Sequence, residues 1–99
     1  MNLFPAIAEK IISHPEVLGI ARETALRWMV ERREPEERIR AWLELLDAAI
    51  ATPAGRGRLL DLLRDDNESA RRLKDFAPFA GILTREERRE IIFSCSFDH

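Results

Sequence analysis

The chain has 99 residues, of which 45% are hydrophobic and 34% are charged. This size and composition suit one small folded domain, because such a chain buries enough apolar surface for a single core and is too short for two ordinary domains. The formal net charge of -2 offers no general excess of positive charge for binding phosphates.

The first half of the chain predicts three helices, each opened by a proline. A short helix is expected near 5-13 and a longer one near 15-33, because proline is well tolerated at the first helical position, where its missing N–H has no partner. The second helix has an apolar face that Leu26 and Val30 widen further. Such width is typical of a helix with neighbours on more than one side. The third helix, near 35-50, repeats apolar residues at i, i+3, i+4 and i+7.

The second half predicts three shorter helices. A Thr-Pro step caps and opens a helix near 53-65, and an Asp-Asn pair closes it and caps the next one, near 68-75. Thr84 with Glu87 three residues later has the capping-box pattern that starts a last helix near 85-93. No stretch alternates apolar and polar residues with a period of two. The sequence therefore predicts an all-α fold, a compact single-domain bundle of five or six helices.

Part of the second helix resembles a known DNA-binding motif. The segment LGIARETALRWM, from Leu18 to Met29, looks like the turn and recognition helix of the helix-turn-helix family. The resemblance implies that Gly19 makes the tight turn. It also implies that Arg22, Glu23 and Arg27 face the major groove, where arginine pairs with guanine and glutamate accepts from cytosine.

The residues before this segment favour an unbroken helix instead. Pro15 would lie inside the first helix of a helix-turn-helix motif, where a proline costs about 3 kcal/mol or more. A glycine inside a helix costs only about 1 kcal/mol. These magnitudes favour one continuous helix that begins at Pro15 and runs through Gly19.

An apolar segment, FAPFAGIL, occupies residues 76–83. Pro78 and Gly81 oppose a long helix, so the segment is predicted to be irregular. Its large side chains either fold back as a lid on the bundle or contact another chain, because large exposed apolar patches are unusual on a monomer and buried aromatics dominate interfaces. The candidate partner-binding residues are Phe76, Phe79, Ile82 and Leu83.

No group of residues has the pattern of a catalytic or metal site. Cys95 and His99 are four residues apart, but no orienting group accompanies them, so we expect a buried thiol and a terminal imidazole rather than a nucleophile. The two histidines and one cysteine lack metal-site spacing. The Gly-Arg-Gly-Arg run at 55–58 lacks the ending of a phosphate-binding P-loop. We expect neither enzymatic activity nor a cofactor.

The remaining signals concern the surroundings of the protein. No run approaches the roughly 18 apolar residues of a membrane span, and the start of the chain has no features of a secretion signal. The single cysteine does not indicate an oxidising compartment, and the preference for Arg over Lys is typical of GC-rich coding. We therefore expect a bacterial, cytoplasmic protein.

Together these patterns favour a small non-enzymatic helical module that acts through protein–protein contact. Adaptor, accessory subunit, antitoxin-like inhibitor and homodimer all fit this description. The partner is then another protein or a second copy of the chain. The alternative is a helix-turn-helix DNA-binding regulator that uses residues 18-29.

Overall fold

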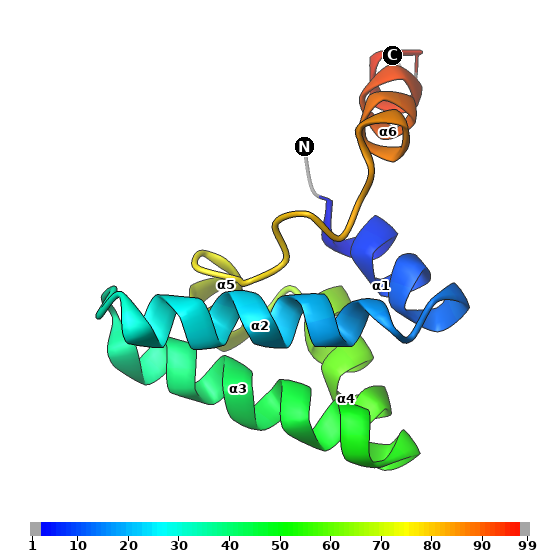
Figure 1. The fold of residues 1–99 in the computed structure, drawn as a ribbon. Helices are drawn as coiled ribbons and strands as arrows, with labels where there is room; N and C mark the ends of the chain where they lie inside the picture. Colours follow the sequence, from blue (N-terminus) through cyan, green and yellow to red (C-terminus); the bar gives the residue numbers. More distant parts are fainter. Residues whose placement is uncertain (1–2, 98–99) are drawn as a thin grey trace.

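A computed structural model describes residues 3–97 of the chain (Figure 1). Within these residues it contains six helices and no strand, which confirms the predicted all-α, single-domain bundle of five or six helices. The helices are α1 (Phe4–Ser13), α2 (Val17–Val30), α3 (Glu36–Ala51), α4 (Pro53–Arg64), α5 (Glu68–Lys74) and α6 (Arg85–Phe97).

The ends of α1, α3, α4 and α5 lie within one residue of the predicted ends. α4 begins at Pro53, and the hydroxyl of Thr52 accepts a hydrogen bond of 2.9 Å from the backbone N–H of Gly55. Asn67 caps α5 in the same way, because its side-chain oxygen accepts from the N–H of Ala70 at 2.8 Å. These caps satisfy N–H groups that a helix start leaves without partners, and they fix where each helix begins.

α2 is shorter at both ends than the predicted span of 15-33. Pro15 does not open it but lies in a tight turn after α1, in which the N–H of Val17 donates to the carbonyl oxygen of His14 at 3.1 Å. At the other end Arg32 has a φ of 55°, in the left-handed region that commonly terminates helices. Glycine usually takes that conformation, so the sequence carried no signal for this earlier end.

Gly19 lies in the first turn of α2, and the helix continues through it without a break. The turn that the helix-turn-helix resemblance implied at Gly19 is therefore wrong. The chain changes direction before α2, at Pro15, as the higher cost of a proline inside a helix requires.

α2, α3 and α4 form the body of the bundle. α2 and α3 lie side by side and run in opposite directions, and α4 packs on α3 (Figure 1). Gly55 lies directly against the backbone of Ala48, where a β-carbon would overlap the carbonyl group. This contact lets α4 approach α3 more closely than any other residue at this position would allow.

The core is centred on Trp42, which is fully buried. Its indole N–H donates to the carbonyl oxygen of Leu73 at 3.0 Å, so its one polar atom is satisfied. Its ring packs perpendicular to the ring of Phe79, with 5.2 Å between the ring centroids. The indole thus joins α3 to the end of α5 and to the segment that follows it.

α6 projects away from the other helices, and only its first half lies near α1 (Figure 1). The predicted capping box is present, because the N–H of Thr84 donates to Glu87 Oε1 at 2.9 Å and the N–H of Glu87 donates to Thr84 Oγ1 at 3.1 Å. Lys10 of α1 reaches the same Glu87 oxygen at 2.8 Å. The hydrogen bonds from Lys10 and then from Thr84 lower the pKa of Glu87 from 4.5 to about 2. The helix extends to Phe97 rather than ending near residue 93.

Candidate interaction surface

The segment at residues 76–83 is a lid on the core. Phe79, Ile82 and Leu83 are at most 7% exposed and belong to the central hydrophobic cluster. The prediction that these three side chains bind a partner is therefore wrong, because their surface is already covered within the chain. Phe76 is half-buried and packs on Trp28, with 4.7 Å between the ring centroids.

The residues implied to read DNA do not form one surface. Arg22 Nε donates to Asp47 Oδ1 at 2.5 Å, and Arg27 lies 3.8 Å from Glu31, so each guanidinium already faces a carboxylate. Arg22 and Arg27 are five positions apart, which places them about 140° apart around the helix. Glu23 is exposed on the side of Arg27. The structure does not bring the two arginines together for one groove.

Metal-binding groups and membrane-spanning helices are both absent from the described part of the chain. Among the side chains that the structure describes, at residues 3–93, no group of three or more His, Cys, Asp or Glu could hold a metal ion. No described helix combines the length and apolarity needed to cross a membrane. The side chain of Cys95 and all of His99 lie outside the described residues.

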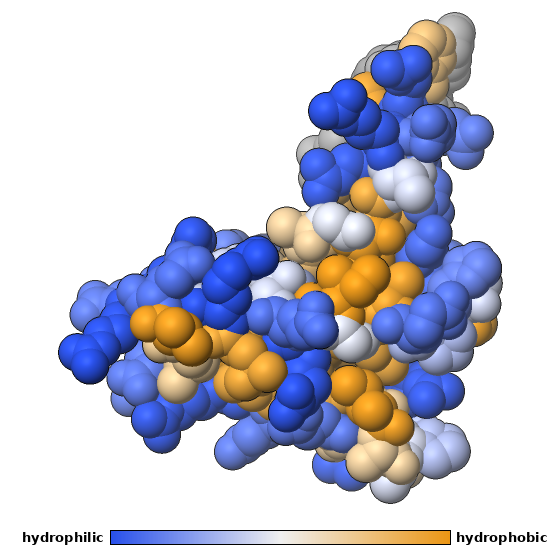
Figure 2. All heavy atoms as spheres, viewed as in Figure 1, coloured by the Kyte–Doolittle hydropathy of each residue, from blue (hydrophilic) through white to orange (hydrophobic). Residues whose placement is uncertain are grey.

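The most distinctive feature of the exposed surface is a set of apolar side chains. Three of the four large hydrophobic side chains that are exposed on α2 and α3 lie toward one side, Leu26 at 38%, Val30 at 82% and Ile50 at 45%, whereas the fourth, Ile20, lies about 120° from Leu26 around α2. Figure 2 shows hydrophobic surface along the second half of α2 and beside α3. The other exposed large hydrophobic residues that the structure describes are Ile12, Ile92 and Phe93.

The Arg22–Asp47 ion pair sets the register of these two antiparallel helices. Residues one turn apart lie above one another on a helix. Leu26, one turn after Arg22, therefore lies beside Leu43, one turn before Asp47.

The same register brings Gly19 beside Ile50 at the other end of the stripe. We call the stripe the α2–α3 face. It comprises Gly19, Arg22, Leu26 and Val30 of α2, and Glu36, Arg40, Leu43, Asp47 and Ile50 of α3.

The α2–α3 face combines apolar residues with balanced charges, the Arg22–Asp47 pair and, near the start of α3, the Glu36–Arg40 pair. Arg22 and Asp47 are 42% and 54% exposed, respectively, and lie one turn in from the Gly19–Ile50 end of the face. Apolar side chains lie on both sides of the Arg22–Asp47 pair, Leu26 and Val30 on one and Ile50 on the other. One sign of this surface is visible in the sequence, namely the excess width of the apolar arc that Leu26 and Val30 create.

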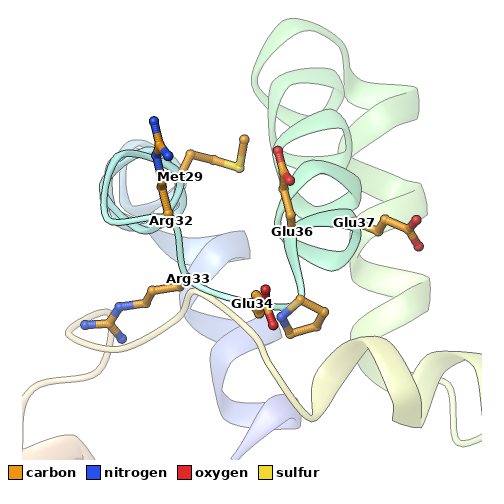
Figure 3. Close-up of a pocket in the computed structure, with 7 residues that line it drawn as sticks. Met29, Arg32, Arg33, Glu34, Glu36 and Glu37 are labelled. Carbon is orange, nitrogen blue, oxygen red and sulfur yellow. The ribbon is translucent and has the colours of Figure 1, made fainter.

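A hollow of about 670 Å³ lies between the end of α2 and the start of α3. Figure 3 shows Met29 and Glu36 on its two sides, whereas Arg33 and Glu37 point away from it. Arg33 stacks over Trp28 at 5.7 Å and pairs with Glu31 at 2.9 Å. The hollow is open and one of its two arginines, Arg33, is already engaged, so we regard it as the end of the groove between α2 and α3.

Comparisons with known protein families, with curated proteins and with solved structures found no match to this chain.

Proposed function

We propose that this protein is a non-enzymatic helical module that acts through protein–protein contact, and that the α2–α3 face is its contact surface. The observation that supports this most directly is the exposure of Val30, at 82%, next to Leu26 and Ile50. Exposed apolar side chains do not stabilise the isolated chain, but they favour association when another surface covers them.

Covering these side chains makes a favourable contribution to binding. Moving one Val, Leu or Ile side chain fully out of water contributes about 1.5–3 kcal/mol. Since Leu26, Val30 and Ile50 are on average about half exposed, covering all three contributes roughly 2–5 kcal/mol per surface. That gain offsets part of the entropy lost on association.

The shape of the face favours helices as its partners. Two antiparallel helices side by side present a shallow groove, and helices of a partner pack into such grooves through their own apolar ridges. A peptide-binding pocket, in contrast to this shallow groove, encloses its ligand.

Site-directed photocrosslinking tests this proposal. A benzophenone-bearing amino acid replaces Val30 in the protein expressed in its native host, and the matched control carries it at Glu68, an exposed polar residue of α5. We expect a discrete crosslinked protein band from position 30 and none from position 68. Absence of any crosslink at position 30, or equal crosslinking at both positions, would refute the assignment of the surface.

A further inference from the structure

We infer that the occupant of the α2–α3 face is a second copy of this chain, stacked face to face about a two-fold axis that runs parallel to α2 and α3. The inference rests on the proposed function and names its partner. It follows from the charges, the shape and the helix directions of the face.

Two symmetric arrangements bring the same face of two copies together with their helices aligned. With the axis parallel to the helices, α2 lies over α3 of the second copy at the same level. With the axis across the helices, α2 lies over α2 of the second copy.

The ion pair discriminates between the two arrangements. An axis parallel to the helices places Arg22 over the second copy's Asp47, and Asp47 over the second copy's Arg22. An axis across the helices, passing at the level of this pair, instead places Arg22 over the second copy's Arg22 and sets two carboxylates together. Like charges opposed across an interface are strongly unfavourable. The face is therefore self-complementary only about the parallel axis.

The shape of the face agrees with the same axis. Gly19 is level with Ile50, so the parallel axis seats Ile50 over the second copy's Gly19. A β-carbon at Gly19 would meet nothing within 4 Å in the isolated chain, so the packing of the single copy does not require glycine there. A glycine on an exposed helix face gives a notch that a side chain from a second copy can fill.

The helix directions favour this arrangement as well. Because α2 and α3 are antiparallel, stacking α2 over α3 of the second copy makes every neighbouring pair in the assembly antiparallel. The result is an up-down-up-down four-helix bundle, in which the helix dipoles of neighbours oppose one another. In Figure 1, α2 lies at the front of the molecule and no other element covers it.

The size of the face predicts a weak dimer. α2 has 14 residues, which at 1.5 Å per residue gives a length of about 21 Å, and two helices side by side are about 20 Å wide. The planar contact is then about 400 Å² per copy, or about 800 Å² in total, which is below the roughly 1,200–2,000 Å² of stable specific interfaces and in the range of weak, transient ones. We expect dimerisation that depends on concentration in the micromolar range.

Reciprocal charge reversal tests the inference. Sedimentation equilibrium of the wild type from about 5 µM to 1 mM is expected to show the mass rising from 11.5 kDa toward twice that value. Arg22→Asp makes this position on the face wholly acidic, and Asp47→Arg makes it wholly basic, so each variant alone is expected to dimerise at least ten-fold more weakly. An equimolar mixture of the two is expected to form a heterodimer with an affinity within about three-fold of wild type. The matched control is Arg58→Asp, on an exposed residue of α4, which should leave the dimer unchanged.

A second variant keeps the test independent of charge. Gly19→Gln introduces a good helix former where the isolated chain has open space, so it should raise the melting temperature at low concentration and weaken dimerisation. Far-UV circular dichroism verifies that all variants remain helical.

Three results would overturn the inference. A wild-type mass that stays at 11.5 kDa over the whole range excludes the second copy, and a crosslink from position 30 to a different protein then retains the proposed function with a foreign partner. A wild-type dimer whose two charge variants also dimerise alone, or fail to combine, excludes the parallel axis. A Gly19→Gln variant that dimerises as well as wild type excludes the notch. A monomer that also yields no crosslink at position 30 refutes the proposed function itself.

Discussion

Two glycines of α4, Gly55 and Gly57, offer a matched test of how closely α4 packs on α3. A β-carbon at Gly55 would overlap the carbonyl oxygen and carbon of Ala48, whereas a β-carbon at Gly57 would meet nothing within 4 Å. We predict that Gly55→Ala destabilises the protein and that Gly57→Ala stabilises it.

The magnitudes follow from two opposing effects. Replacing glycine by alanine in a helix stabilises by about 0.5–1 kcal/mol, and at Gly57 this is the whole effect. At Gly55 the added methyl group meets backbone, which no side-chain rotation can move, so α4 must shift away from α3. Overpacking of this kind costs about 1–3 kcal/mol. Because the added β-carbon would overlap two backbone atoms, we take the upper end of this cost, about 3 kcal/mol. The expected net loss at Gly55 is then about 2 kcal/mol, and the difference between the two variants is about 3 kcal/mol.

Urea and thermal unfolding at a few micromolar protein, followed by far-UV circular dichroism, measure both changes. In a domain of this size about 1 kcal/mol shifts the melting temperature by about 4–8 °C. Gly55→Ala should therefore melt roughly 8–16 °C below wild type, and Gly57→Ala a few degrees above it. A Gly55→Ala variant as stable as Gly57→Ala would refute the close contact between α4 and Ala48.

The remaining predictions concern α6 and the lid. Because Glu87 has a folded pKa of about 2, below its ordinary 4.5, its contribution to stability is complete above about pH 4.5 and is lost as the pH falls toward 2. Glu87→Gln should flatten the pH dependence of stability in this window, whereas Glu86→Gln should not. Urea unfolding between pH 2 and 6 measures both, and equal slopes would contradict the pairing with Lys10. Phe79→Ala, which removes the ring against Trp42, should lower the free energy of unfolding by about 3–4 kcal/mol, whereas Val30→Ala should change it by no more than about 0.5 kcal/mol. A loss below about 1 kcal/mol at Phe79 would show that the lid is not part of the core.

Local chemistry in the sequence predicted most of the helix boundaries. Thr52 and Asn67 use their own side chains to cap α4 and α5, and residues nearby in the chain carry that information. Arg32 ends α2 in a left-handed conformation without a glycine, so no residue type marked the position. Pro15 marked a boundary correctly but lies in the turn rather than at the first position of the helix.

The lid was harder to place because its environment is built by distant residues. The sequence indicated that Phe79 must be covered, but not by what. Its ring packs on Trp42, which comes from α3, and no local pattern reports a contact between such distant positions. The alternatives of lid and partner surface differ only in which surface covers the same side chains, and that is a property of the assembled fold.

For α2, in contrast to the lid, the sequence carried information that the fold of the single chain leaves unused. A helix that packs against one core needs an apolar arc on one side, and α2 satisfies this with Leu18, Ala21 and Ala25, which are buried. Leu26 and Val30 extend the arc beyond what the fold covers. The sequence thus indicated more than one neighbour for α2, and the structure supplies only part of that cover from within the chain.

The Arg22–Asp47 pair links this unused width to specificity. An exposed ion pair stabilises a single chain by only about 0.2–1 kcal/mol, because water screens both charges. The same two charges gain importance when a second apolar surface excludes water around them, since the attraction strengthens as the surroundings become less polar. The apolar residues of the face then favour association in any orientation, whereas the ion pair favours one orientation alone. Reversing either charge should therefore affect dimerisation far more than the stability of the single copy, and comparing the two effects in Arg22→Asp separates the contribution of the pair to orientation from its contribution to folding.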